Sequence, residues 1–168
     1  MIIELKELNL NDGRDIFEML KEIGPGENGF SGSGYDIEYE EFPDYLREQI
    51  DMAQGIGLDL SRYVPQTRYW LITDGKPVGM GKLRHYLNDN LKIEGGHIGY
   101  SIRPSERGKG YGNLILQELL KKARQKEIEE VLITCREDNI RSRKVIEHNG
   151  GELESIADGR CKYWIKGL

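Results

Sequence analysis

The chain has 168 residues, of which 38% are hydrophobic and 32% charged, and this size and composition predict one globular domain over residues 1–168. No apolar run reaches the length of a membrane helix and the N-terminus lacks the pattern of a signal peptide, so we expect a cytoplasmic protein with no membrane partner. A net charge of −5 argues against nucleic acid as a partner, and the two cysteines form no cluster at metal-ligand spacing, so no metal is expected.

The first third of the chain predicts one strand and two helices. Residues 2–8 form the strand, and apolar residues at helical spacing then predict a helix whose N-cap is Asn11 or Asp12. A second helix is expected over residues 40–54. The stretch between the helices, residues 26–36, is rich in Gly and Ser but also carries aromatic and acidic residues. It is typical both of a flexible connector and of a lid that gathers substrate.

A hairpin follows in the middle of the chain. Residues 67–73 and 77–86 have strand character, and the Asp-Gly-Lys sequence between them is a turn signal. Gly79 and Gly81 in the second strand indicate a bulge or a close backbone approach. The connection over residues 87–96 is predicted to be irregular.

The most informative stretch runs from His97 to Ala123. Residues 97–103 alternate as a strand, Pro104 ends it, and a glycine-rich segment over residues 107–112 leads directly into a helix. The first N–H groups of a helix have no partner inside it, and glycines allow an anion to approach them closely. This stretch therefore predicts a cradle for a phosphate or pyrophosphate. The spacing matches neither the dinucleotide fingerprint nor the Walker pattern.

The last third of the chain predicts two further units. Residues 130–136 form a strand that should run parallel to strand 97–103, because a helix connects them. Asp138 or Asn139 caps a helix that reaches about His148. Two final strands are expected over residues 152–156 and 161–165.

The sequence resembles the GNAT N-acetyltransferase superfamily in several respects. The pattern R-x-x-G-x-G, formed by Arg107, Gly110 and Gly112, resembles the acetyl-CoA signature of that family. Asn139 and Ser142 resemble its N-x-x-[AS] segment, and the order of elements is the family's order over essentially the whole chain. Segments similar to those of a small group of bacterial GNAT proteins lie at residues 28–30, 63–67, 83–88 and 95–111.

The resemblance implies an α/β (α+β) fold, the GNAT acyl-CoA N-acyltransferase fold. This fold has a mixed, mostly antiparallel sheet of about seven strands, flanked by about four helices, with a splayed parallel pair in the middle. In that fold the last strand inserts between the fifth and sixth strands. Cys135 and Cys161 would then lie on neighbouring strands.

The resemblance also implies an N-acetyltransferase that uses acetyl-CoA as co-substrate and no metal. The acceptor would be a primary amine of a small molecule or a protein, acetyl transfer would be direct, and a homodimer is possible. The residues expected to bind acetyl-CoA are Ile102, Arg103, Arg107, Gly108, Lys109, Gly110, Tyr111, Gly112, Asn139 and Ser142. Two alternatives are an acyl-CoA-binding protein of the same fold without turnover, with a sensor or regulatory role, and an unrelated nucleotide-phosphate binder.

The catalytic groups are less clearly marked. Many family members carry a tyrosine as general acid at the position that Ile146 occupies here. Either the acid is missing and the thiolate leaves unassisted, or another residue serves, for which Tyr111 and Tyr163 are the candidates. For the general base, His97 and Glu94 lead, and His85 is a further candidate. Residues to examine for an acceptor pocket are Glu27, Tyr45, Arg68, Arg84 and His85.

Overall fold

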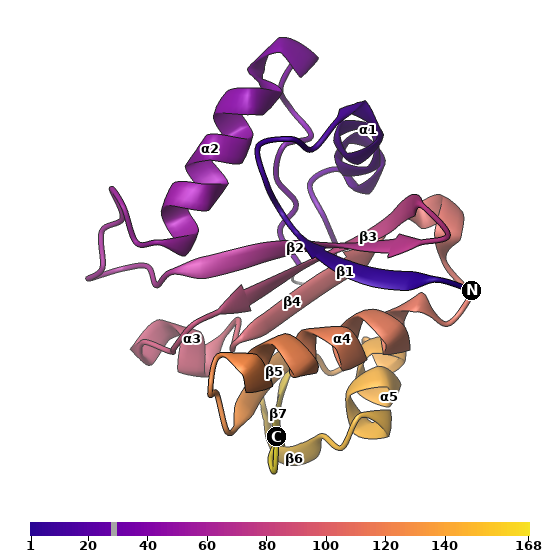
Figure 1. Ribbon diagram of the computed structural model, residues 1–168. Coiled ribbons are helices and arrows are strands. Elements are labelled where there is room, and N and C mark those ends of the chain that lie inside the picture. The colour runs from indigo at the N-terminus through magenta and orange to yellow at the C-terminus, as the bar shows by residue number, and fades with distance from the viewer. Residues whose placement is uncertain (28–29) are drawn as a thin grey trace.

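The computed structural model, which describes residues 1–27 and 30–168, contains two antiparallel sheets (Figure 1). The large sheet has the strand order β1-β2-β3-β4, with β1 at Ile3–Glu7, β2 at Gln66–Thr73, β3 at Lys76–Arg84 and β4 at Ile98–Ile102. The small sheet has the order β5-β7-β6, with β5 at Val131–Arg136, β6 at Glu152–Ala157 and β7 at Arg160–Ile165. The order of strands is the one that the family resemblance implied, but the strands of the described residues form two antiparallel sheets rather than one mixed sheet.

Helices cover both faces of the large sheet. Figure 1 shows α1 (Arg14–Ile23) and α2 (Phe42–Ala53) on one face and α4 (Tyr111–Gln125) on the other, with α5 (Ile140–His148) beside the small sheet. Trp70 and Met80 bury against α1 and α2, whereas Leu71 and Leu83 belong to the core under α4. Because β2 and β3 are buried on both faces, their sequences are largely apolar rather than alternating. No helix of the described residues is long and apolar enough to cross a membrane.

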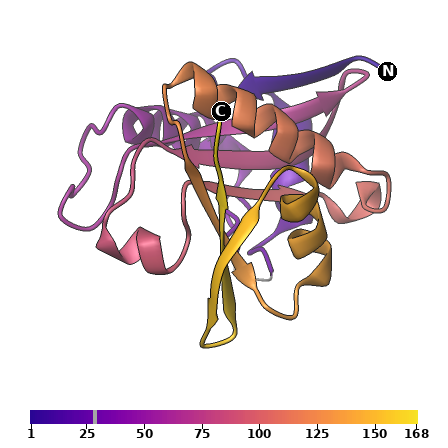
Figure 2. The same cartoon turned by 90° about the horizontal axis from the view of Figure 1, so that it is seen from below.

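The two sheets meet where β4 and β5 begin. The N–H of His97 donates to the carbonyl of Leu132 at 2.8 Å, and from this contact the two strands separate without forming a ladder. Figure 2 shows the strands of the small sheet running across the direction of β4. A gap therefore opens between β4 and β5, which is the splayed pair expected from the sequence.

The glycines of β3 allow α4 to lie close to the sheet. A Cβ atom at Gly81 would lie 2.9 Å from a methyl carbon of Leu119, and one at Gly79 would lie 2.7 Å from Ile102. The predicted bulge is present, since the register of β2 against β3 shifts beside Gly79, and a Cβ atom at Gly79 would also lie 3.0 Å from the carbonyl oxygen of Ser101. The close packing at these glycines holds α4 over β3 and β4, which fixes the start of that helix at the end of β4.

Cys135 and Cys161 are direct register partners on β5 and β7, and both are free, so the predicted insertion of the last strand is confirmed. The N-cap prediction for the first helix was wrong: Gly13 is the cap, and Asp12 accepts hydrogen bonds from the Asn9 N–H at 2.9 Å and the Trp70 indole at 2.7 Å.

A short helix, α3 (Asp89–Ile93), occupies part of the connection that the sequence predicted to be irregular. Its signal is Asn88, whose side chain accepts the N–H of Leu91 at 2.9 Å. Five residues are too few for a recognisable apolar period.

Candidate functional site

A cleft of about 910 Å³ lies between the separating strands β4 and β5. Its walls come from β4, β5, the loop that precedes α4, the first turn of α4 and the first turns of α5. Glu27 and Phe30, from the loop after α1, also line it. The described part of that loop therefore borders the cleft; the similar segment at residues 28–30 lies partly outside the described residues.

The predicted anion cradle opens into one end of this cleft. Gly108 and Gly110 have φ angles of 81° and 83°, and a Cβ atom at either would meet no atom within 4 Å. The loop surface is therefore open, and the glycines supply left-handed backbone that other residues adopt at a cost. Tyr111 and Gly112 begin α4 and line the cleft, so the unpaired N–H groups of the helix start face it.

The basic residues of this loop are paired with carboxylates. The side chain of Glu106, only 7% exposed, forms ion pairs with Lys109 at 2.6 Å and with Lys76. Hydrogen bonds from these two ammonium groups lower the pKa of Glu106 to about 2. Lys109 does not line the cleft, whereas Arg107 does, and Arg107 pairs with Glu27. Each of these basic side chains thus has a carboxylate partner within the protein, with Lys76 and Lys109 sharing one.

The peptide groups of β4 provide a second set of contacts. The carbonyl of His97 accepts from the Arg84 N–H at 2.7 Å and the Arg103 N–H donates to Val78 at 2.9 Å, both toward β3. By the alternation of a strand, the peptide groups of Tyr100 and Ile102 point the other way, toward the cleft. The Ile102 carbonyl accepts from Nε of Arg107 at 3.0 Å.

Arg103, which the sequence placed among the ligand contacts, lies elsewhere. Its N–H is used by β3, and its guanidinium donates to Glu22 at 3.0 Å and to the Pro77 carbonyl at 3.0 Å. Arg103 does not line the cleft, so it fixes the end of β4 against α1.

Asn139 and Ser142 lie opposite β4 and line the cleft. Asn139 is the N-cap of α5, and its side-chain oxygen accepts the N–H of Ser142 at 3.2 Å. The capping role that the sequence predicted for Asn139 is therefore present, and the side chain also faces the cleft.

His97 has a structural position rather than an exposed one. The residue is 7% exposed, it does not line the cleft, and its Nδ1 accepts the N–H of Leu132 at 2.9 Å. Burial, together with the nearby charge of Arg84, lowers the pKa of His97 to about 4. A neutral imidazole here joins the two sheets, so we no longer assign it the role of general base.

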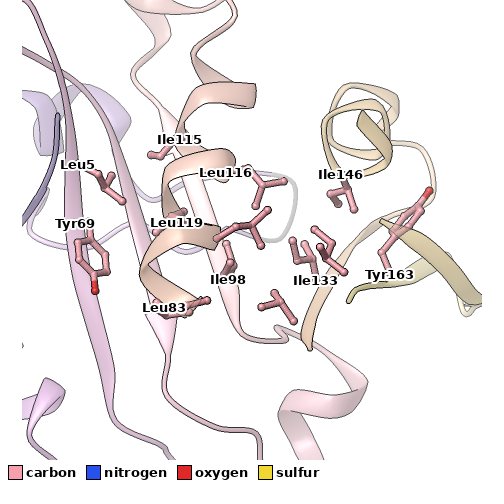
Figure 3. Close-up of a cluster of buried hydrophobic side chains, with 14 of the residues drawn as sticks. Leu5, Tyr69, Leu83, Ile98, Ile115, Leu116, Leu119, Ile133, Ile146 and Tyr163 are labelled. Atoms are coloured by element: carbon pink, nitrogen blue, oxygen red, sulfur yellow. The ribbon is translucent and has the colours of Figure 1, made fainter. Parts of the chain in front are cut away.

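Tyr163 likewise does not line the cleft. Its ring is buried, and its hydroxyl donates to Glu147 at 2.7 Å and accepts from Nε of Arg143 at 3.0 Å. Figure 3 shows Ile146 between Leu116 of α4 and Tyr163. We therefore no longer assign Tyr163 the role of acid.

Of the candidate catalytic residues, Glu94 and Tyr111 do line the cleft, and Glu94 pairs with Arg160 at 3.0 Å. Of the acceptor candidates, Glu27 and Arg84 line it, whereas His85 bonds Thr67 at 2.8 Å outside it.

Two polar residues of the cleft were missed by the sequence reasoning. The hydroxyl of Tyr100 is buried without a hydrogen-bond partner among residues 1–27 and 30–168, and burial raises the pKa of Tyr100 to about 12. Lys82 lines the cleft from β3. In the sequence Tyr100 shares the apolar face of its strand with Ile98 and Ile102, so it has the pattern of a core residue. Lys82 could have been found as a charged residue within a strand that is otherwise buried.

The fold is shared with solved acetyltransferases. The ribosomal L7/L12 α-N-protein acetyltransferase RimL, solved with coenzyme A disulfide-bonded to a cysteine, superposes with a TM-score of 0.70 at 20% identity, over 98% of this chain and 93% of that one. The N-acetyltransferase PseH of Campylobacter jejuni, solved with acetyl coenzyme A, gives 0.65 at 13% identity, over 99% and 100%. The L7/L12 acetyltransferase of Salmonella typhimurium gives 0.65 at 18% identity, over 99% and 95%.

Comparison of the sequence with family models identifies the family of this chain more directly than the structural superpositions do. A search against curated proteins finds no match. The model of the acetyltransferase (GNAT) domain matches residues 33–152, which is more than half of the chain and includes the cradle, β5 and α5. The chain therefore belongs to the GNAT acetyltransferase domain family.

Proposed function

We propose that this protein is an N-acetyltransferase that transfers the acetyl group of acetyl-CoA directly to a primary amine of a small molecule or a protein. The observation that carries the proposal is the open glycine loop at the start of α4, which lies at one end of the cleft between β4 and β5. Relatives of the same fold have been solved with coenzyme A or acetyl coenzyme A, which supports the same co-substrate here.

In this proposal the pyrophosphate of CoA binds the N–H groups around Gly110 and Gly112, with Arg107 and the other residues of the 107–112 loop around it. The peptide groups of Tyr100 and Ile102 hold the pantetheine arm in the manner of an added strand. Asn139 and Ser142 border the arm from α5. Arg107 bonds the Ile102 carbonyl through Nε and pairs with Glu27 through Nη1, and we expect the pairing with Glu27 to compete with the phosphate for Arg107.

The transfer step forms a bond between the amine nitrogen and the acetyl carbon while the carbon–sulfur bond breaks. The amine loses a proton, for which Glu94 is the proposed acceptor, directly or through water. The thiolate gains a proton, and Tyr111, which lines the cleft, is the donor we propose. Tyr100 also lines the cleft, but burial raises the pKa of Tyr100 to about 12, which makes its hydroxyl a poor proton donor.

Direct transfer is favoured over an acetyl-cysteine intermediate by the state of Cys135. This residue lines the cleft, but burial and the neighbouring Cys161 raise the pKa of the Cys135 thiol to about 11. The thiolate, which is the nucleophile, is therefore scarce at neutral pH.

The test is a thermal shift with acetyl-CoA, NAD and ATP on the wild type and on a variant carrying Arg107→Ala and Gly110→Ala. A ligand at a hundred times its Kd adds about 2.7 kcal/mol to the free energy of unfolding. We expect stabilisation by acetyl-CoA that is lost in the double variant and kept in Lys121→Gln, an exposed control on α4. Absence of any shift with acetyl-CoA would contradict the proposal.

The second candidate is a protein that binds acyl-CoA without turnover. It is favoured by Ile146, which is fully buried at the position where many family members carry the acid tyrosine. Release of free thiol from acetyl-CoA in the presence of a panel of amines separates the two. Binding without thiol release for any amine would favour the second candidate.

A further inference from the structure

Three basic side chains lie together at the end of the cleft that the phosphate loop does not occupy. Arg68 on β2 and Lys82 on β3 are direct register partners, and Arg84 follows two residues later on the same face of β3. This face of the sheet is the one that α1 and α2 cover. Arg68 is 7% exposed and Lys82 is 8% exposed, so both cations are largely removed from water.

The charge of this cluster is not balanced by the protein. Across residues 1–27 and 30–168, no carboxylate forms an ion pair with Arg68, Lys82 or Arg84. Arg68 donates from Nε to Gln49 at 2.6 Å, but its Nη1 is buried with no partner among those residues. A buried cation without a counterion is costly, so the arrangement calls for an anion from outside.

The cluster is accessible from the cleft. Lys82 and Arg84 line it, and Nη1 of Arg84 is fixed by the carbonyls of Gly95 and Gly96 at 3.1 and 3.0 Å. The Lys82 side chain lies over Gly99 of β4, since a Cβ atom at Gly99 would meet its Cε at 2.9 Å. Arg68 stands behind Lys82 and does not line the cleft.

This position differs from the pyrophosphate cradle. Gly99, beside Lys82, comes before Tyr100 and Ile102 on β4, whose peptide groups are assigned to the pantetheine arm. The cradle begins after β4 has ended, so it lies at the other end of those peptide groups. The Lys82 ammonium lies 5.2 Å from the centre of the Phe30 ring, so an apolar wall stands beside the cations. An anion here would belong to the acceptor rather than to CoA.

We propose that the acceptor is a small amine that carries a carboxylate or phosphate, and that Lys82 and Arg84 bind this anionic group with Arg68 behind them. The proposal rests on the acetyltransferase function proposed above. It names the chemical class of the acceptor, and it makes Lys82 a specificity-determining residue rather than a catalytic one.

The electrostatics of Lys82 agree with this assignment. Burial, followed by the charges of Arg84 and Arg68, lowers the pKa of Lys82 to about 7. The phenol of Tyr45 also faces Arg68, and it is bonded to Ser33 at 2.7 Å. An anion bound between these groups supplies the missing counter-charge and keeps Lys82 protonated.

The experiment compares three amines as ligands: 4-aminobutyrate, 2-aminoethyl phosphate and 1-aminobutane, the last with no anionic group. Each is titrated in a thermal-shift assay with and without CoA, so that the preference is measured whether or not CoA binds. The variants are Lys82→Gln, Lys82→Arg, and Lys121→Gln as an exposed control that removes the same charge. Rates of acetyl-CoA turnover are then measured with the same set.

We expect an anionic amine to bind roughly tenfold or more tightly than 1-aminobutane, the effect of one charge-assisted contact. Lys82→Gln should reduce this preference severalfold, because only Arg84 then contacts the anionic group, whereas Lys82→Arg and Lys121→Gln should retain it in full. Equal binding of all three amines to the wild type would overturn the inference. A uniform loss of turnover in Lys82→Gln with every amine, and no change in preference, would also overturn it, since Lys82 would then serve the transfer step. Failure of acetyl-CoA to bind would instead count against the proposed function.

Discussion

The two ends of the cleft differ in whether their basic side chains have carboxylate partners. At the loop before α4 the basic side chains already have carboxylate partners, with Glu106 between Lys76 and Lys109, and the ligand is left to the peptide N–H groups. At the other end Arg68, Lys82 and Arg84 are gathered without a carboxylate among the described residues. A site that binds by its backbone can be stable when empty, whereas a site that binds by buried charge is costly until its ligand arrives.

The junction between the two sheets, which lies beside Arg84, should be the most sensitive point. Gly96 has a φ angle of 59°, and a Cβ atom there would lie 2.3 Å from the carbonyl oxygen of Leu132. The same Leu132 carbonyl accepts the N–H of His97, which holds β4 beside β5, and the Gly96 carbonyl accepts from Arg84. We therefore expect Gly96→Ala to lower the free energy of unfolding by at least about 3 kcal/mol. Denaturant unfolding measures the effect.

Gly108→Ala is the matched control for that variant. Its φ angle is also positive, 81°, but the space around it is open, so only the backbone strain of about 1 kcal/mol applies. Equal losses in both variants would show that the contact with Leu132 does not matter and that the two ends do not depend on this junction.

The two ends also differ in how far the sequence reveals them. The phosphate end is formed by one continuous stretch of sequence, in which a strand, a glycine-rich loop and a helix follow one another within about twenty residues. This stretch is long enough for the apolar period of the strand and that of the helix to be recognised. The order of strands and helices followed from local patterns along the chain, whereas the neighbouring positions of Cys135 and Cys161 followed only from the family resemblance. The short helix α3 was not predicted, because its five residues are too few to show a helical repeat of apolar positions.

The acceptor end is assembled from residues far apart in sequence. Arg68 and Arg84 were candidates by residue type alone, but Lys82 became visible only through its register with Arg68 and its position over Gly99. His97 shows the converse: a histidine at a strand start was a reasonable base, yet its ring accepts a hydrogen bond from Leu132, 35 positions further along the chain. Such contacts depend on how the sheets meet, which no local pattern records.

The cost of the unbalanced end can be measured through Lys82→Met. The pKa of Lys82 is lowered from 10.5 to about 7, so between these pH values the unfolded chain binds more protons than the folded one. Wild-type stability therefore rises with pH across this window, and below pH 7 the folded state bears the full penalty of the buried cation. We expect Lys82→Met to be more stable than the wild type by about 1–3 kcal/mol near pH 6.5, and the difference to shrink toward pH 10.

Unfolding curves at several pH values, with Lys121→Met as the exposed control, test this expectation. The control should show no such slope, because Lys121 is exposed and pairs with Glu118 at the surface. A loss of stability in Lys82→Met at pH 6.5 would mean that the ammonium is well compensated, and the contrast between the two ends would disappear.

The smallest expected effect concerns Glu27, which connects the two ends. Its carboxylate pairs with Arg107 of the phosphate loop, while Phe30 of the same loop lies over Lys82. The carboxylate is more than half exposed, so Glu27→Gln should change the free energy of unfolding by less than about 1 kcal/mol. The same substitution releases Arg107 from its partner, and acetyl-CoA should bind a fewfold more tightly, with a steeper dependence on salt.

Titration of acetyl-CoA at low and moderate ionic strength measures both quantities, and Asp44→Gln serves as the control because Asp44 also forms an exposed pair with an arginine, Arg47. Tighter binding in Glu27→Gln but not in the control would show that Glu27 competes with the pyrophosphate for Arg107. Unchanged binding would mean that Arg107 keeps both partners when CoA binds.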